Sequence, residues 1–241
     1  MKFTLSTLPT VTAPDGARHQ PYHHGDLRNA LVQAGTDLAR EGGPSAIVLR
    51  EAARRVGVSA NAAYRHFSSL PDLVDAVAFV ALALLARSME KELAKCRPSG
   101  DAGQDAVDRM KAVGRGYVIF ALSEPGLFAT AFGPRATSGQ HGGGPSPHGE
   151  SVVDADGTKL GIGESGLTAY ELLEQSLDGM LAAGVLDAAD RAVAPTNAWA
   201  AVHGLSGLLL GPLAAEAAGA RESLIDASLD LVCRGLITRS G

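Results

Sequence analysis

The most constraining feature of this sequence is the spacing of its apolar residues, which follows the period of an α-helix along most of the chain. Between residues 26 and 42, apolar side chains recur at i, i+4, i+7 and i+11, as Leu27, Leu31, Ala34 and Leu38. Aromatic residues make up only 5% of the chain, and β-branched runs, which indicate strands, are scarce. With 241 residues, 46% of them hydrophobic, the chain can bury a core in one large or two small domains. We therefore predict an all-α fold.

Breaks in this pattern divide the chain into an arm, a small head and a larger body. Residues 1–21 have no helical period and are expected to form a flexible arm. Residues 22–69 form the head and residues 70–241 the body. Within the body, residues 133–166 are rich in Gly, Pro and Ser, so we expect a disordered loop there. The expected helices span residues 26–42, 48–56, 59–67, 70–96, 103–122, 125–132, 167–183, 195–215 and 221–238.

One stretch of the body, from Ala192 to Ala215, contains no Asp, Glu, Lys or Arg. Its length and its Gly207-x-x-x-Gly211 spacing are features of membrane helices that pair. Its polar residues and prolines, and the lack of basic flanks, argue against a membrane span. A helix that is apolar on all sides is equally typical of a bundle core or a subunit interface. We favour the interface and expect no membrane association.

Charge and motif content narrow the function classes. Residues 1–70 hold eight Lys/Arg and five Asp/Glu, a net charge of +3, whereas residues 71–241 hold thirteen and twenty-one, a net charge of −8. A basic head on an acidic body suits a head that meets an anion. Cys96 and Cys233 have no metal-ligand residues nearby, and His23-His24 lacks a third ligand, so no metal is expected. No phosphate-binding loop, dinucleotide fingerprint or nucleophile motif is present, so we expect neither a cofactor nor enzymatic activity.

The head contains the pattern of a helix-turn-helix, with Gly57 in the turn between two short helices. In this motif the N-terminal residues of the second helix meet base edges in the major groove of DNA. Here those residues are Ser59, Ala60, Asn61 and Ala62. An Asn side chain can bond an adenine edge in two places, and an Ala methyl group can pack on a thymine methyl group. Tyr64 and His66 follow, where their side chains can donate to phosphates.

At this point the sequence resembles a known family. The run Tyr22-His23-His24-Gly25-Asp26-Leu27-Arg28, followed by REAARRVGVSANAAYRHFSSLPDLVDAV (residues 50–77), resembles the DNA-binding head of TetR/AcrR-type transcriptional regulators. Less specifically, Trp199, His203 and Gly204 match a Trp-x-x-x-His-Gly pattern of a ligand-binding body. The resemblance implies an all-helical homodimer that binds a palindromic operator and releases it when a small molecule enters the body. It assigns phosphate contacts to Tyr64 and His66. A cytoplasmic location is expected separately, because the two cysteines indicate no disulfide framework and suit a reducing compartment.

The chain departs from the family pattern at two positions. Val48 stands where the family often has Ser or Thr, and Leu70 stands where it often has Lys. Both changes remove phosphate donors, so DNA binding would depend more on Arg28, Arg50 and Arg65. Each residue also has a structural interpretation: Ser59 as a helix cap, Tyr64 as a half-buried aromatic, and Arg54 and Arg55 as a solvated face.

A small-molecule sensor needs an apolar cavity with a few polar groups. The candidate lining residues are Met110, Tyr117, Phe120, Phe128, Phe132, Met180, Trp199 and His203. Residues of these types at helical spacing also form ordinary cores. Their low polarity favours an apolar or aromatic effector. The dimer interface is expected at Gly204, Gly207, Leu208, Gly211, Leu224 and Leu231.

The function predicted from the sequence is therefore a dimeric DNA-binding regulator, with a repressor favoured. Two alternatives stay open. One is an activator, or a regulator without an effector. The other is a helical small-molecule-binding protein whose operator binding is weakened or lost through Val48 and Leu70.

Overall fold

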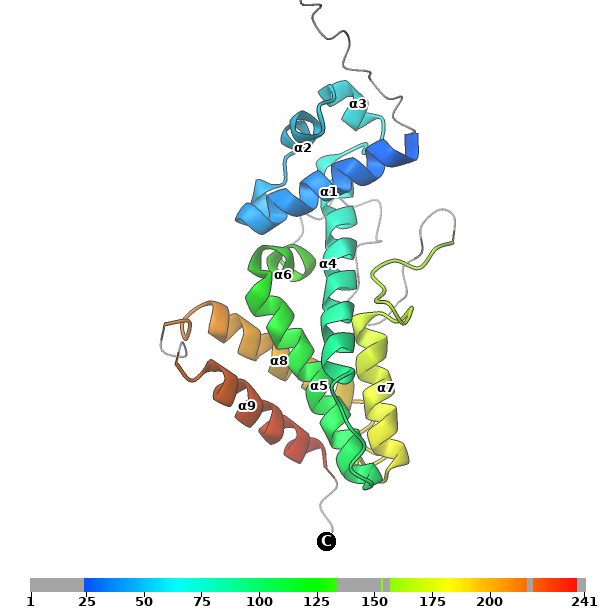
Figure 1. The fold of residues 1–241 in the computed structure, drawn as a ribbon, viewed down its shortest axis with the longest axis vertical. Coiled ribbons are helices and arrows are strands. Elements are labelled where there is room, and N and C mark those ends of the chain that lie inside the picture. The colour runs from blue at the N-terminus through cyan, green and yellow to red at the C-terminus, as the bar shows by residue number, and fades with distance from the viewer. Residues whose placement is uncertain (1–23, 134–152, 154–156, 216–218, 238–241) are drawn as a thin grey trace, which may run out of the picture.

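The computed structural model describes residues 24–133, 153, 157–215 and 219–237 of the chain, so the predicted arm lies outside the described residues. Within these ranges the chain forms nine α-helices, one 3-10 turn (η1) and isolated β-bridges, which confirms the all-α prediction. Figure 1 shows an elongated molecule with the head at one end of the long helix α4. The elements are α1 (His24–Gly42), η1 (Pro44–Ala46), α2 (Leu49–Val56), α3 (Ala60–Tyr64), α4 (Leu70–Leu93), α5 (Ala102–Ser123), α6 (Pro125–Phe132), α7 (Ala169–Ala182), α8 (Ala194–Leu210) and α9 (Arg221–Leu236).

Capping residues fix the helices of the head. Gly57 adopts φ 78° at the end of α2, a left-handed conformation that favours Gly. The Ser59 hydroxyl accepts the backbone N–H of Ala62 at 3.2 Å and so caps α3. The prediction that α3 runs to about residue 67 is wrong, because the helix ends at Tyr64. The chain then turns tightly, and Phe67 enters the core with 1% of its surface exposed.

The long helix α4 joins head and body. Its N-terminus has the predicted capping box: the Ser69 hydroxyl accepts the Asp72 N–H, and the Asp72 carboxylate accepts the Ser69 N–H. Further along, α4 crosses α5 at very close range. A Cβ atom on Gly116 would lie 2.5 Å from the Met89 Cα, so only Gly fits at this crossing. The two helices thus form the centre of the body.

The remaining helices cover α5, with α7 on one side and α8 and α9 on the other (Figure 1). Helix α8 ends at Leu210 rather than near residue 215 as predicted. Gly211 and Pro212 follow, and proline has no N–H with which to continue a helix. No helix in the described ranges is long and apolar enough to cross a membrane.

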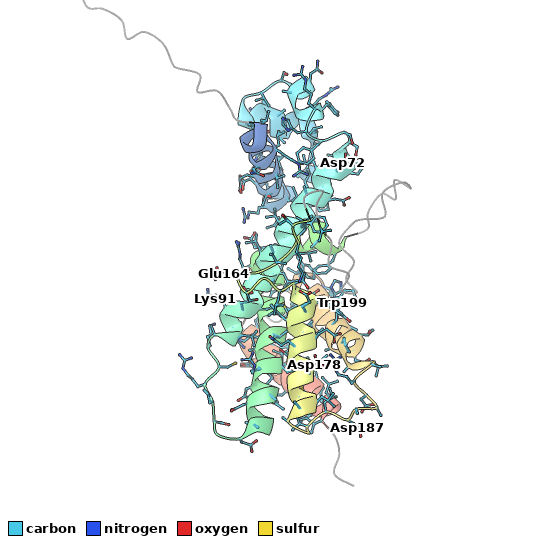
Figure 2. The ribbon with its side chains drawn as sticks, turned by 90° about the vertical axis from the view of Figure 1, so that its right-hand side faces the viewer. Asp72, Lys91, Glu164, Asp178, Asp187 and Trp199 are labelled. Carbon is cyan, nitrogen blue, oxygen red and sulfur yellow. The ribbon has the colours of Figure 1, made fainter. Side chains whose placement is uncertain are left out.

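The segment before α7 is more ordered than its composition suggests. Most of the predicted disordered loop lies outside the described residues, but residues 157–166 follow a defined path along α4, so the prediction is wrong there. The Glu90 carboxylate of α4 accepts the N–H groups of Glu164 and Ser165, each at 2.9 Å, and the Ser165 hydroxyl at 2.5 Å. Burial would raise the pKa of Glu90, but these bonds outweigh it and hold the pKa below its ordinary value. Figure 2 shows Glu164 at the level of Lys91 near the end of α4.

Helix α6 packs directly on the head. A Cβ atom on Gly126 would lie 2.0 Å from the carbonyl oxygen of Ala39, so the first turn of α6 touches the backbone of α1. An ion pair reinforces this junction, with Arg40 Nε 3.1 Å from Glu124 Oε2. Head and body are therefore connected twice, through α4 and through α6.

Candidate DNA interface and ligand site

The polar side chains of α3 point away from the head. Asn61 is exposed, and the Tyr64 side chain is 47% exposed. Ala63 is the residue of α3 that faces the core, with no exposed surface. The predicted base-facing segment thus lies on an open surface, where side chains can reach a partner. That Tyr64 is exposed weakens the interpretation of it as a half-buried aromatic.

Arginines of the head fall into two groups. Within the described residues, Arg50 and Arg65 have no carboxylate within ion-pair distance. In contrast, Arg54 Nη2 lies 2.7 Å from Glu51 Oε1, and Arg55 bonds both Glu41 and Glu51. Hydrogen bonds from these two guanidinium groups lower the pKa of Glu51 to about 2. Arg50 and Arg65 therefore remain available to an anionic partner, while Arg54 and Arg55 are already neutralised.

The other predicted DNA-binding residues surround α3. The guanidinium carbon of Arg28 lies 4.8 Å from the ring centre of Phe67, a cation–π contact that holds this exposed side chain on the head. His66 is half-buried in the turn after α3. Val48 and Leu70 are 45% and 41% exposed, so both apolar replacements face solvent. Tyr22 and His23 lie outside the described residues.

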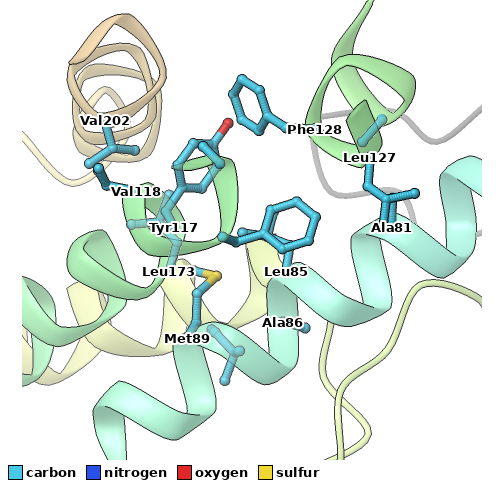
Figure 3. Close-up of a cluster of buried hydrophobic side chains, with 14 of the residues drawn as sticks. Ala81, Leu85, Ala86, Met89, Tyr117, Val118, Leu127, Phe128, Leu173 and Val202 are labelled. Atoms are coloured by element: carbon cyan, nitrogen blue, oxygen red, sulfur yellow. The ribbon is translucent and has the colours of Figure 1, made fainter. Parts of the chain in front are cut away.

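In the body, five of the eight predicted pocket residues come together as an aromatic cluster. It contains Tyr117 of α5, Phe128 and Phe132 of α6, and Trp199 and His203 of α8. Ring centres of neighbouring members lie 5.1 to 6.3 Å apart, in edge-on or tilted arrangements. Figure 3 shows the Tyr117 hydroxyl directed toward the side of Phe128, away from Met89 on α4.

A short chain of hydrogen bonds joins three members of this aromatic cluster. The indole Nε1–H of Trp199 donates to the Tyr117 hydroxyl at 3.1 Å, and that hydroxyl lies 2.8 Å from His203 Nδ1. Burial raises the pKa of the Tyr117 phenol and lowers the pKa of His203. Both side chains therefore stay uncharged at neutral pH.

The other three predicted pocket residues lie apart from the aromatic cluster. Phe120 is buried on α5 without a ring contact to the cluster. Met110 precedes Tyr117 by seven residues, about 10 Å along the helix at 1.5 Å per residue. Met180 is fully buried near the end of α7. These three are core residues of the body.

Sequence reasoning did not find the hydrogen bonds within the cluster, although one signal was present. Trp199 and His203 are four residues apart, and side chains at this spacing share one face of a helix. The missing information was the position of Tyr117, which belongs to a helix more than eighty residues earlier in the chain.

Two open clefts lie elsewhere, at the foot of the body between α5 and α9. Their volumes are about 610 and 440 Å³, and both are lined by Lys111 and Asp230. Lys111 Nζ and Asp230 Oδ1 form an ion pair at 2.6 Å, so the charges of the clefts largely neutralise each other. Within the described residues, no group of three His, Cys, Asp or Glu side chains could hold a metal ion.

Exposed leucine and glycine residues gather on α8 and α9, and α8 carries no charged residue. All six residues predicted to form a dimer interface are exposed: Gly204, Gly207, Leu208, Gly211, Leu224 and Leu231. Leu231 is 65% exposed, which is unusual for a leucine in a helix. A Cβ atom on Gly204 or Gly207 would meet nothing within 4 Å. The surface therefore has room for the close approach of another helix.

Comparison with known proteins gives two family matches. The family described as "Bacterial regulatory proteins, tetR family" matches residues 31–77, and the one described as "Tetracyclin repressor-like, C-terminal domain" matches residues 110–232. No curated protein sequence matches the chain.

Several solved structures share the fold. A protein of unknown function from Rhodococcus sp. RHA1 is 24% identical, with a TM-score of 0.66, over 92% of this chain and 100% of that one. A proposed tetR family transcription regulator from Shewanella sp. PV-4 is 15% identical, with a TM-score of 0.56, over 88% and 99%. A variant of TetR from Acinetobacter baumannii AYE, in complex with minocycline, is 17% identical, with a TM-score of 0.54, over 86% and 91%.

Proposed function

Because the chain belongs to the tetR family of bacterial regulatory proteins, we propose that it is a cytoplasmic repressor that binds a palindromic operator as a homodimer and is released by a small apolar molecule. The observation that carries the proposal is the open surface of α3. Its polar side chains and the neighbouring unpaired guanidinium groups need a partner that supplies both acceptors and negative charge. A DNA duplex supplies both, as base edges and phosphates.

Different residues of the head are suited to base contacts and to phosphate contacts, according to their charge. Asn61, with its alanine neighbours, is suited to base contacts. Arg50, Arg65 and Tyr64 are suited to phosphates. Arg54 and Arg55 are already paired with carboxylates and contribute less. The exposed side chains of Val48 and Leu70 offer no donor, so phosphate binding relies on the arginines.

The test is binding of labelled DNA from upstream of the chain's own gene, measured by fluorescence anisotropy at two salt concentrations. We expect binding that is specific for a palindrome and weakens steeply with salt. Arg65→Ala should weaken binding to all sequences and reduce the salt slope by about one. Asn61→Ala should relax specificity, with a cost of about 1–3 kcal/mol on the preferred site. Arg54→Ala is the matched control, since its guanidinium group is paired with Glu51.

The competing function is a small-molecule-binding protein that has lost operator binding. Only weak, sequence-independent DNA binding, unchanged by Asn61→Ala, would favour it. Activation of a reporter gene by the intact protein would instead favour an activator.

The dimer is proposed to form through the exposed leucine and glycine residues of α8 and α9. Two recognition helices must reach successive major grooves about one helical turn apart, which a single head cannot do. Gly207→Leu should place a bulky side chain on this surface and yield monomers with poor operator affinity. Light scattering measures the mass, and Gly179→Leu on the exposed face of α7 is the control. An unchanged dimer mass in Gly207→Leu would count against this interface.

The effector is proposed to bind at the aromatic cluster. The side chains of Phe132, Trp199 and His203 are each only partly buried, so a molecule can reach them. Because α6 carries Phe128 and Phe132 and also packs on α1, a ligand there can change the position of the head.

A further inference from the structure

The hydrogen bonds of the aromatic cluster have a direction, and that direction determines which proton His203 carries. An indole N–H is only a donor, so Trp199 donates to the Tyr117 oxygen. The Tyr117 O–H is then left to donate, and the atom 2.8 Å away is Nδ1 of His203. Nδ1 therefore accepts, and the neutral imidazole carries its proton on Nε2.

The Nε2–H group of His203 is a donor with no acceptor within hydrogen-bond distance among the described residues. His203 is only partly buried, so this N–H can meet a molecule that enters from solvent. A donor in such a place binds an acceptor on a ligand more strongly than it does in water, because the surroundings are apolar.

Within the described residues, the two helices that flank this donor carry no charge. Helices α6 and α8, which supply four of the five rings, contain no Asp, Glu, Lys or Arg. The nearest cation along α5 is Arg115, and its guanidinium group bonds Glu222 and Asp226 of α9. A charged ligand would lose its hydration without gaining a counter-charge, which is costly.

We propose that the effector is an uncharged molecule with an aromatic or apolar body and one hydrogen-bond acceptor, such as a carbonyl oxygen, and that the Nε2–H of His203 binds this acceptor. The inference rests on the small-molecule site proposed above and adds the chemistry of its ligand. Phe128, Phe132 and Trp199 contact the body of the molecule. Tyr117 is a positioning residue, because it acts through His203 by holding its tautomer.

The test uses three probes of similar shape: acetophenone has an acceptor, ethylbenzene has none, and benzoate carries a charge. Trp199 is the only tryptophan of the chain, so its indole N–H gives a single signal in a ¹H–¹⁵N spectrum that reports on the site without further assignment. We expect acetophenone to move this signal and to bind about fivefold to tenfold more tightly than ethylbenzene, as one neutral hydrogen bond allows. Benzoate should not bind.

Two variants of His203 locate the donor. His203→Phe keeps a ring but has no N–H, so acetophenone and ethylbenzene should bind it equally. His203→Gln keeps an N–H at a similar distance from the backbone and should retain the preference. In the free protein, histidine nitrogen shifts should show the Nε2–H tautomer at His203, and Tyr117→Phe should produce a tautomer mixture.

The outcomes separate the inference from the proposed function. Equal binding of acetophenone and ethylbenzene by the unaltered chain overturns the inference alone. So does a preference that survives in His203→Phe, or binding of benzoate as tight as that of acetophenone. If neither acetophenone nor ethylbenzene moves the indole signal while operator binding is intact, the small-molecule site itself is overturned, and the inference with it.

Discussion

Polar side chains of the candidate sites face solvent in the head but bond one another in the interior of the body. In the head, the polar groups of α3 and the neighbouring Arg50 and Arg65 face solvent, and no carboxylate of the described residues pairs with either arginine. In the body, Tyr117 and Trp199 turn inward and bond each other. The proposed DNA surface is left open, because a duplex would supply the missing acceptors. The proposed small-molecule site is lined by groups that are already oriented by their neighbours.

The largest expected effect comes from breaking the junction between the two regions. Gly126→Ala places a Cβ atom 2.0 Å from the Ala39 carbonyl, a clash with backbone that no rotamer can relieve. We expect a loss of about 3 kcal/mol in the free energy of unfolding, at the upper end for overpacking. Urea unfolding measures the loss, and hydrogen exchange in α1 shows whether the head is released first.

Gly179→Ala provides the matched control for that substitution. Gly179 is exposed on α7, and a Cβ atom there meets nothing within 4 Å. The same change should stabilise the protein by about 0.5–1 kcal/mol, through helix propensity alone. A loss of stability in both variants would show that the contact between Gly126 and Ala39 is not the cause.

The same substitution, Tyr to Phe, made once in the body and once in the head tests the difference between the two regions directly. Tyr117→Phe leaves the Trp199 N–H and the His203 Nδ1 without their partner, at an expected cost of about 1–3 kcal/mol. Tyr64→Phe removes an exposed hydroxyl and should change stability by less than about 0.5 kcal/mol. Thermal unfolding measures both. Operator affinity should show the reverse order, and similar losses of stability in the two variants would contradict the contrast.

The smallest effect is expected from Glu51→Gln, which removes the carboxylate that pairs with Arg54 in the head. The pKa of Glu51 is lowered to about 2 in the folded state. The carboxylate therefore stabilises the fold at any pH above the pKa that Glu51 has in the unfolded chain, and this contribution is lost as the pH falls toward 2. The variant should therefore be slightly less stable than the parent chain at pH 7. The difference should vanish between about pH 4 and pH 2. The freed Arg54 should raise DNA affinity at low salt, whereas Arg55 stays paired with Glu41.

Urea unfolding across this pH range and anisotropy with one DNA duplex check both expectations. A stability difference that persists at the acidic end would mean that the Glu51 carboxylate is not its source. An unchanged DNA affinity would mean that Arg54 faces away from the duplex.

Local signals predicted the parts of the fold that depend on neighbouring residues. The spacing of apolar residues predicted all nine helices, and Gly57, Ser59 and Ser69 marked ends that the structure confirms. The error at the end of α3 has a local cause as well. Phe67 is buried in the core, and the turn that brings it there ends the helix after Tyr64 in spite of helix propensity.

Contacts between distant residues could not be predicted in the same way. The bonds from Glu90 to Ser165 join positions seventy-five residues apart, and the composition of residues 157–166 indicates only flexibility. The contact between Gly126 and Ala39 depends on how α6 packs against α1. A single glycine in the sequence does not predict that packing. The resemblance to a known family indicated a ligand-binding body, but the orientation of His203 needed three side chains from two helices.

The hydrogen bonds from residues 164 and 165 to the Glu90 carboxylate also have a practical consequence. At the end of α6 the Gly133 N–H bonds the Ala129 carbonyl, and before α7 the chain is held at residues 163–165. Both anchor points are independent of the number of residues between them. Doubling the length of such a connection costs only about 0.6 kcal/mol of closure entropy. A change in the number of residues between these anchors should therefore leave α6 and α7 in their positions, which makes chain length here a parameter that can be varied without loss of the fold.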